Sequence, residues 1–477
     1  MDTPSEATAI VSAMTPPKGR LFGYDAVEDK QRRKPPVARN RSEDMELNVS
    51  QRAKLAGSTR DLQRNFTIAA WMIRKHLDYV STFSFQARTG VDALDERLEE
   101  LMRQWSHRKN CDAARRHTLA RMIRLAEARR TVDGDVFCVK LADGRLQWVE
   151  GDRVRTPLMG LPPGLDQKSF VHGVQVNKAG EALAYCICKR TTAGGFEFER
   201  LLRSDFVEHH GFFDRFDQVR GISPLAPAIN TLVDTYESFD YALAKAKVAQ
   251  LFALAFYRDA EDTGGEIVTG GADADADGEV DDKAGYEVNF GRGPIKLDLD
   301  PGDRAEFLES KSPSSEFQAF TQAMLIVALK ALDIPYSFYD ESFTNYSGSR
   351  GALLGYEQSA NIKREDNRQL LSAITAWRIR LWILDGQLVL PAGLPMEGLR
   401  WEWIAKGTPW LDPLKEVQAD IAAVGAGLTS RTRRCKQRGE DFFEIVDELA
   451  AENAYLTERG LPTKADPSNV QIVEIAK

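Results

Sequence analysis

The feature that most constrains the fold is a long helical pattern in the middle of the chain, opened by Ser223 and Pro224. Ser is a favoured N-cap residue and Pro suits the first helical position, so we expect one helix over 222–257. Apolar side chains recur in it at steps of three and four residues, at Ile229, Leu232, Val233, Tyr236, Phe239, Leu243 and Ala246. At 1.5 Å per residue the helix would be about 50 Å long, which exceeds the need of most globular cores. The pattern therefore predicts a helix that spans, lines or assembles something.

Composition narrows the class of protein. The chain has 477 residues, of which 43% are hydrophobic, enough for a core and several domains. Its net charge of -8 comes from interspersed acidic and basic residues, which is typical of a soluble protein and not of one that grips a nucleic-acid backbone. We expect no transmembrane helix and no secretory signal, because no long apolar run occurs. The five scattered cysteines favour a reducing compartment.

The first half of the chain reads as an irregular arm followed by a mixed domain. Residues 1–45 lack periodicity, whereas residues 46–221 combine helical and strand patterns. The expected helices lie after Ser58, near 91–108 and near 112–132, and the expected hairpins turn at 142–145 and 177–181. This mixture of helical and strand patterns over residues 46–221 predicts an α+β domain.

The second half of the chain has mainly helical patterns, which one stretch of different composition interrupts. The Gly- and Asp-rich stretch 261–285 buries little and predicts a loop. Ser315 and Gln318 form a capping box that predicts a second helix, which Pro335 ends. A polar and aromatic loop is expected at 336–349. The remaining expected helices lie at 350–384, after Asp412-Pro413, and after Asp441. Asp441 is the expected N-cap of the last helix, and Glu444 stands at the reciprocal capping position.

One acidic motif resembles half of a calcium loop. Asp273, Asp275 and Asp277 alternate and are followed by Gly278, as in the first six positions of an EF-hand loop. The twelfth position, where a bidentate Glu is needed, is Ala284. The pattern favours a solvated acidic loop over a calcium site.

Signals for catalysis are absent from the sequence. It contains no phosphate-binding P-loop, no Gly-x-Ser-x-Gly elbow and no His-Glu-x-x-His helix. His209 and His210 would point to opposite faces of a strand, which argues against a shared metal. Cys186 and Cys188 would face one side of a strand, and we interpret them as buried thiols. We therefore expect no enzyme, no catalytic residue, no metal and no cofactor.

Several short motifs follow one another in an order found in a known family. They are Val171–Val176, Glu208–Arg220, Gln218–Ala228, Leu297–Asp303, Asn345–Arg350, Trp410–Glu416, Gly427–Ser430 and Gly439–Glu444. Together they resemble the portal proteins of lambda-type phages, over roughly residues 20–460. The chain departs from that pattern at Gly348, where the family usually has Ser, and in its Asp-rich insertion. The order of the motifs, not any single one, carries the resemblance.

The resemblance implies an architecture: a mainly helical α+β subunit that assembles into a ring, usually a dodecamer, around a central channel. The implied regions are an arm at 1–45, a wing at 46–221, a first stem helix at 222–257, a clip at 258–312, a second stem helix at 313–335, a tunnel loop at 336–349, a wing helix with return strands at 350–410, and a helical crown at 411–477.

The resemblance also implies functional positions and partners. The positions are Phe343, Asn345, Tyr346 and Arg350 in the tunnel loop, Asp234, Glu237, Lys245 and Lys247 on the channel face of the stem, and Asp273, Asp275 and Asp277 in a motor-docking loop. The implied partners are double-stranded DNA, the large terminase or packaging motor, capsid and scaffold proteins, and head–tail connector proteins, with no membrane. The implied location is the capsid portal vertex of the virion, and the host cytoplasm during assembly.

The charge pattern suits a conduit. DNA that moves through a ring cannot be held by many Lys or Arg contacts, since each neutralised phosphate strengthens binding. The first long helix mixes both signs at its polar positions, a pattern that also suits a solvated face or ion pairs between subunits. The alternative interpretations are a ring or scaffold protein that conducts no DNA, and a DNA-processing nuclease.

Overall fold

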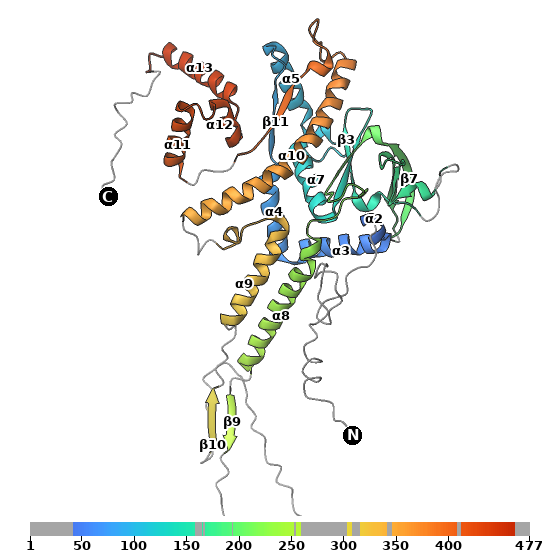
Figure 1. Cartoon of the computed structure of the whole chain (residues 1–477), viewed down its shortest axis with the longest axis vertical. Helices are drawn as coiled ribbons and strands as arrows, with labels where there is room; N and C mark the ends of the chain where they lie inside the picture. The colour runs from blue at the N-terminus through green and yellow to red at the C-terminus, as the bar shows by residue number, and fades with distance from the viewer. Residues whose placement is uncertain are drawn as a thin grey trace, which may run out of the picture. The chain divides into compact units, whose positions relative to one another are not determined.

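The structure is a computed structural model of the whole chain (Figure 1). The residues that it describes are 42–157, 165, 167–192, 194–251, 254–258, 303–307, 315–340, 346–407 and 412–462. They form two compact units. Of the described residues, unit 1 takes those within 42–58, 83–223 and 367–404, and unit 2 takes those within 59–82, 224–366 and 405–462.

The centre of unit 1 is a three-stranded antiparallel sheet. β2 (Asp135–Lys140) is its middle strand, flanked by β3 (Leu146–Glu150) and β8 (Val207–Gly211). The turn between β2 and β3 contains Gly144, whose φ of 80° is the left-handed conformation that Gly adopts without strain. The first hairpin predicted from the sequence is thereby confirmed.

Two further sheets complete the strands of unit 1. A four-stranded antiparallel sheet has the order β4 (Phe170–Val171), β5 (Val174–Val176), β6 (Ala182–Arg190) and β7 (Phe196–Arg203). The pairing of β5 with β6 confirms the second predicted hairpin. The third sheet joins β1 (Phe83–Ala87) to β11 (Trp401–Ala405), two strands far apart in the sequence.

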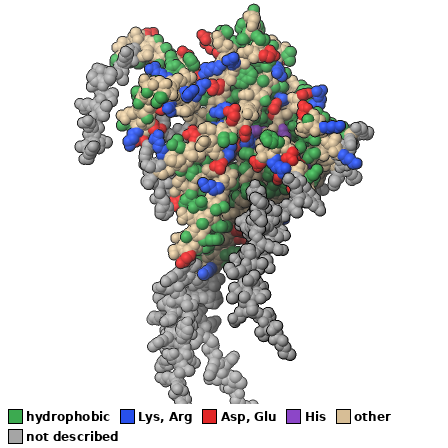
Figure 2. Space-filling model, viewed as in Figure 1, with side chains coloured by type: hydrophobic (Ala, Val, Ile, Leu, Met, Phe, Trp, Pro, Cys, Tyr) green, Lys and Arg blue, Asp and Glu red, His purple; other side chains and the backbone are tan. Residues whose placement is uncertain are grey.

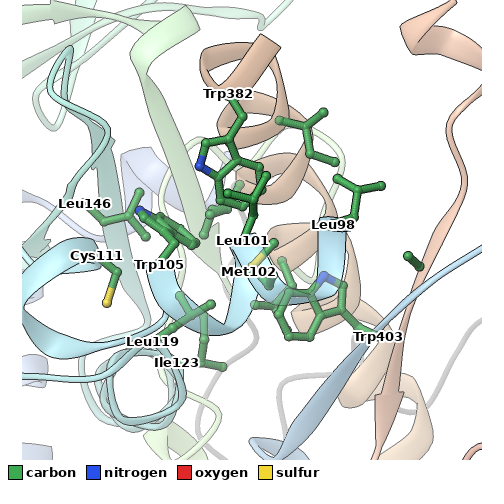
Figure 3. Close-up of a cluster of buried hydrophobic side chains, with 14 of the residues drawn as sticks. Leu98, Leu101, Met102, Trp105, Cys111, Leu119, Ile123, Leu146, Trp382 and Trp403 are labelled. Carbon is green, nitrogen blue, oxygen red and sulfur yellow. The ribbon is translucent and has the colours of Figure 1, made fainter. Parts of the chain in front are cut away.

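Unit 1 contains six helices or parts of helices among its described residues. They are α2 (Glu43–Glu46), the first part of α3 (Val49–Asn65), α5 (Asp92–Trp105), α6 (Arg108–Cys111), α7 (Leu119–Asp133) and the last part of α10 (Tyr346–Leu384). Of these, α5, α6, α7 and the last part of α10 pack in a tryptophan-rich core. Leu94, Leu98, Leu101 and Trp105 recur at helical spacing and form the buried face of α5. Figure 3 shows Trp105 and Trp382 in this core; their ring centroids are 6.4 Å apart and nearly perpendicular. The Trp105 indole N–H donates to the carbonyl of Gly144 at 2.8 Å, which satisfies its polar atom.

Unit 2 contains a pair of long helices. α8 (Ile229–Leu251) and α9 (Ser315–Leu329) lie side by side in Figure 1, and the rings of Phe239 and Phe317 meet with centroids 6.4 Å apart. β9 (Leu254–Arg258) pairs antiparallel with β10 (Asp303–Phe307). The other helices of unit 2 are the last turns of α3, α4 (Thr67–Val80), the first part of α10, α11 (Pro413–Gly425), α12 (Arg431–Arg438) and α13 (Phe442–Glu458).

The first long helix is shorter than the sequence pattern suggested. α8 begins at Ile229, after a 3₁₀ turn at Ala226–Ala228, and residues 254–258 form a strand. Ser223 is not its N-cap, because its hydroxyl donates to the carbonyl of Thr131 at 2.7 Å instead. The physical reason is Pro227, which lacks an N–H and would clash with the preceding turn inside an α-helix.

The expected loop at 336–349 is also shorter. Tyr336–Phe338 form a 3₁₀ turn, and α10 begins at Tyr346. Residues 346–349, which were expected in the loop, therefore belong to the helix. No Pro occurs in this stretch, and a single Gly such as Gly348 costs a helix only about 1 kcal/mol. Phe338 packs on Tyr79 of α4, with ring centroids 5.7 Å apart.

The helical pattern after Ser58 divides into two helices. Phe66 lies between α3 and α4 with an extended backbone, φ -108° and ψ 108°, and its side chain is buried against Tyr236 with ring centroids 5.2 Å apart. Burial of this ring accounts for the break. The segment expected as a helix over 112–132 likewise starts late, with α7 at Leu119, because the Asp112 carboxylate accepts hydrogen bonds from the backbone of the preceding loop.

The predicted helix starts near the C-terminus are confirmed. Asp412 caps α11 by accepting from the Lys415 N–H, and Asp441 caps α13 by accepting from the N–H groups of Phe443 and Glu444. Across the described ranges, none of the helices combines the length and the apolarity that crossing a bilayer requires.

Candidate functional site: the Arg220 anchor and the stem

A dense set of hydrogen bonds in unit 1 surrounds Arg220, six residues before the 3₁₀ turn Ala226–Ala228 that precedes α8. Its Nε donates to Asp135 Oδ2 at 2.6 Å and its Nη2 to Asp135 Oδ1 at 2.9 Å. Both side chains are almost fully buried. This two-pronged geometry is the strongest arrangement of an Arg–carboxylate pair. We call Arg220, Asp135 and the groups bonded to them the Arg220 anchor.

The remaining donors of Arg220 bind three backbone carbonyls from two further segments of the chain. Nη1 donates to the carbonyls of Val154 at 2.7 Å and His172 at 2.6 Å, and Nη2 donates to that of Gly151 at 2.7 Å. The guanidinium therefore has its charge balanced by a carboxylate and its N–H groups satisfied by protein acceptors. Such complete satisfaction is what makes a buried charge tolerable.

Asp135 has further partners. Its Oδ2 accepts from the Gly221 N–H at 3.0 Å and from His209 Nε2 at 3.2 Å, and Arg52 Nη2 lies 3.3 Å away. Burial would raise the pKa of Asp135, but the charge and hydrogen bonds of Arg220, with Arg52, hold it well below its ordinary value. The carboxylate is therefore ionised at neutral pH.

Burial lowers the pKa values of Arg52 and His209, the cationic and imidazole groups that contact Asp135. Burial, with repulsion from Arg220, lowers the pKa of Arg52 to about 10, so that its guanidinium stays charged at neutral pH. Burial also lowers the pKa of His209, against the opposing effect of its hydrogen bond to Asp135. His209 is consequently a neutral donor, stacked on Phe137 at a centroid distance of 4.3 Å.

The N-terminal helix is fastened to the same place. Asp44 of α2 accepts from the backbone N–H of Val219 at 2.7 Å and of Arg220 at 3.3 Å. The backbone carbonyl of Asp44 accepts from His172 Nε2 at 2.9 Å. The segment that leads into α8 is thus held from both sides within unit 1.

The anchor is built for rigidity and not for chemistry. Its carboxylate and its arginine neutralise each other, and the cavity beside it, lined among others by Arg52, Asp133 and His172, has a volume of only about 60 Å³. Among the residues that the structure describes, no group of three or more His, Cys, Asp or Glu side chains could hold a metal ion.

The paired histidines and cysteines lie as the sequence predicted. His209 bonds to Asp135, whereas His210 turns to the other face of β8 and lies 3.4 Å from Glu127 Oε2. Cys186 and Cys188 are both buried in one small apolar cluster with Phe170.

The stem positions implied by the resemblance fall on two faces of α8. At about 100° per residue, Asp234, Glu237 and Lys245 lie within roughly 80° of one another. Lys247 lies about 140° around the helix from Asp234. All four side chains are exposed. The structure therefore brings three of the four together on a face that carries both signs of charge.

The α8–α9 pair also exposes apolar side chains, and one of them, Tyr241, lies on the same face of α8 as Asp234, Glu237 and Lys245. Figure 2 shows such side chains on the visible face of the pair. The exposed large apolar residues of the two helices are Tyr236, Phe239, Tyr241, Leu243, Phe320, Ile326 and Val327. Tyr241 is 73% exposed and Val327 61% exposed, far more than single core-facing helices leave uncovered. An apolar surface of this extent indicates an interaction surface.

The remaining implied positions are only partly placed. Phe343 and Asn345 of the tunnel loop lie outside the described residues, as do Asp273, Asp275 and Asp277 of the clip. Tyr346 is the first residue of α10. Arg350, one turn further, has its Nη1 3.5 Å from Glu416 Oε1 of α11.

Sequence reasoning missed the anchor itself. Arg220 and Gly221 entered only as letters of a motif, and Asp135 was not singled out. The available signal was a Gly beside each charged residue, Gly134 before Asp135 and Gly221 after Arg220, which suggests that two backbones approach closely.

Comparison with known proteins matches most of the chain to one family. The family model for "Phage portal protein, lambda family" matches residues 30–364, more than half of the chain. The chain is 24% identical over 453 residues to the portal protein of Escherichia phage N15, covering 84% of each chain. It is also 24% identical over 456 residues to portal protein B of Escherichia phage lambda, covering 85% of this chain and 84% of that one.

Solved structures with a similar chain come from gene transfer agent particles. A chain from the virion of a native particle matches with a TM-score of 0.42 at 15% identity, covering 82% of this chain and 99% of that chain. A chain from the neck of an empty particle matches with a TM-score of 0.45 at 16% identity, covering 80% and 94%. The family assignment rests on the sequence match, and the matched family is a structural one. The chain belongs to the lambda family of phage portal proteins and is a portal subunit of the capsid vertex.

Proposed function

We propose that twelve copies of this chain form a closed ring whose central channel conducts double-stranded DNA. In this proposal α8 and α9 are the stem, β9 and β10 belong to the clip, the region around the start of α10 is the tunnel loop, unit 1 supplies the wing, and α11 to α13 form the crown. Family membership supports the ring, and the observation in this chain that carries it is the exposed apolar surface of the α8–α9 pair.

The residues that the structure describes in a single chain leave much of that surface uncovered. Tyr241 and Leu243 of α8 and Phe320 of α9 are each more than half exposed. Burying apolar surface is worth roughly 25 cal/mol per Å², so neighbouring stems in a ring would gain substantially by covering each other. A ring also gives each copy the same two contact faces, as closed cyclic symmetry requires.

The mixed charge of the remaining stem face suits a conduit. Asp234 and Glu237 repel phosphates, while Lys245 on the same face attracts them, so no deep electrostatic trap forms along the helix. A face of Lys and Arg alone would slow translocation. Mixed charge therefore supports passage of DNA, not its storage.

The partners of the ring follow from the conduit. The ring would dock the packaging motor during genome packaging and connector or tail proteins afterwards, and it would pass DNA again during ejection. Capsid and scaffold proteins would surround it, and assembly would take place in the host cytoplasm. The acidic stretch containing Asp273, Asp275 and Asp277 is the proposed docking segment for the motor.

The mass of the purified protein tests the ring, and DNA threading tests the conduit. Twelve copies of the 53.3-kDa chain would weigh about 640 kDa, and negative-stain images should show rings with a central hole. A compact dimer without a hole would contradict the proposal. If a linear duplex with one blocked end cannot thread the ring, the DNA-conduit proposal is contradicted. The interpretation that remains is a ring-forming scaffold protein.

A further inference from the structure

The three C-terminal helices form a group with little burial. None of the residues of α11, α12 or α13 is buried. Helices of this length gain most of their stability from packing an apolar face, so this group lacks cover in the isolated chain. Its exposed large apolar residues are Leu414, Ile421, Leu428, Phe443, Val446, Leu449 and Tyr455.

α12 and α13 carry equal and opposite charge. α12 has five cationic side chains in eight residues and no acidic one: Arg431, Arg433, Arg434, Lys436 and Arg438. α13 has five carboxylates in 17 residues and no cation: Glu444, Asp447, Glu448, Glu452 and Glu458. In a chain whose net charge is only -8 and whose charges are otherwise interspersed, this separation stands out.

Part of this charge has no ion-pair partner among the residues of the same chain that the structure describes. Arg434 lies 3.4 Å from Asp420 of α11, and Arg438 pairs with the same carboxylate. Arg431 and Arg433 are exposed, and their side chains have no ion pair to any residue that the structure describes. The same holds, among the described residues, for Asp447, Glu448 and Glu452 on α13.

We propose that the basic helix α12 of one copy lies against the carboxylate face of α13 of the next copy, so that Glu448 and Glu452 face the positive charge that Arg431 and Arg433 contribute from two sides of α12. This inference rests on the ring proposed above. Each copy offers one basic and one acidic helix, which is the requirement of a head-to-tail contact repeated around a ring.

A second copy fits this surface better than nucleic acid does. A phosphate backbone would be attracted by α12 but repelled by the five carboxylates of the helix that follows it, only three residues further along the chain. A neighbouring copy satisfies both helices at once. Opposite charges aligned in this way also fix which face meets which, because like charges facing each other are unfavourable.

Charge reversal tests the contact. Variant A carries Arg431→Glu and Arg433→Glu, variant B carries Glu448→Lys and Glu452→Lys, and a third variant carries all four changes. The fraction of protein in rings is measured by native mass spectrometry over a range of protein concentrations at low salt. The control is Arg431→Lys with Arg433→Lys, which keeps the charge. Circular dichroism checks that each variant keeps its helix content.

The expected pattern is specific to a head-to-tail ionic contact. Variants A and B alone should need about tenfold more protein to form rings, and the charge-conserving control should match the wild type. The variant that carries all four changes should form rings at the same protein concentration as the wild type. An equimolar mixture of A and B should also recover ring assembly, as alternating rings, because every boundary then brings opposite charges together.

Other outcomes separate the two proposals. If the wild type forms no ring at all, the ring proposal fails and this inference fails with it. If the wild type forms rings and variants A and B form them equally well, only this inference is overturned. It is likewise overturned if variant A keeps its rings but binds a short DNA duplex more weakly, since α12 would then be a nucleic-acid surface.

Discussion

Gly134 and Gly221 meet backbone to backbone at the Arg220 anchor. A Cβ atom built on Gly221 would lie 2.2 Å from the carbonyl oxygen of Gly134, and one on Gly134 would lie 2.6 Å from that of Gly221. No side chain fits between two backbones at this separation. The contact places the Gly221 N–H against Asp135 and so sets the position of Arg220 beside it.

Substitution of Gly221 by Ala should therefore be strongly destabilising. The added methyl group would collide with backbone, which cannot move aside as a flexible side chain can, and we expect a loss of about 2–4 kcal/mol. Gly57→Ala is the matched control, because a Cβ there meets nothing within 4 Å and Gly57 lies in the helix α3. It should be neutral or stabilising by roughly 0.5–1 kcal/mol. Thermal unfolding followed by tryptophan fluorescence measures both. Equal effects of the two changes would contradict the close contact.

Removal of the Arg220 side chain should leave Asp135 as a buried charge with too few partners. Arg220→Ala is expected to cost about 3–5 kcal/mol in the free energy of unfolding of unit 1. Arg203→Ala is the control, since the Arg203–Asp205 pair is largely exposed, and it should change stability by less than about 0.5 kcal/mol. Urea unfolding compares the two. A small loss for Arg220→Ala would show that the anchor does not hold unit 1 together.

The low pKa of His209 predicts loss of stability in mild acid. Burial keeps folded His209 neutral, whereas an unfolded His takes up a proton near pH 6.5. Below about pH 6.5 the unfolded state therefore binds more protons, and the free energy of unfolding falls as the pH falls. His209→Gln retains a donor for Asp135 but cannot titrate.

The pH profile of this variant gives the measurement. His209→Gln should be less stable than the wild type at pH 7.5, because it loses the stacking on Phe137, yet its stability should change less between pH 6.5 and pH 5. His172, whose pKa burial also lowers, accounts for part of the slope that remains. Parallel profiles for the variant and the wild type would exclude His209 as a source of the acid sensitivity.

Replacing an acidic residue of the proposed channel face on α8 by a basic one should strengthen the binding of DNA. Asp234→Lys adds a cation to the face shared with Lys245, so we expect rings of this variant to bind duplex DNA more tightly and with a steeper dependence on salt. Asp240→Lys makes the same change of charge about 120° around α8 and is the matched control. Fluorescence anisotropy of a labelled duplex over 50–300 mM salt compares them. Tighter binding by both variants alike would mean that the two faces are equivalent, and that Asp234 does not mark a channel face.

Local patterns in the sequence predicted much of the fold. The turn at Gly144, the caps at Asp412 and Asp441, and the opposite orientations of His209 and His210 each depend on a few neighbouring residues. Long-range contacts explain the errors. Phe66 interrupts a helical pattern because its ring is buried against Tyr236, some 170 positions away in the chain, and Ser223 does not cap a helix because its hydroxyl bonds to Thr131.

The anchor could not be derived from local patterns at all. Arg220 binds carbonyls from two segments that are distant from it in the sequence, and no periodicity relates Gly151, Val154 and His172 to it. Helical geometry groups Asp234, Glu237 and Lys245 on one side of α8 and places Lys247 about 140° away from Asp234. That these residues line a channel stays a prediction.

The hydrogen bonds of Arg220 have a mechanical consequence. The chain runs from Gln218 through Ser223 directly into the segment of α8, so tension on that helix reaches unit 1 at this point. Five bonds from one rigid guanidinium to four partners share such a load in parallel. Arg220 therefore cannot leave its place until all five are broken. The root of α8 is built to resist being pulled out.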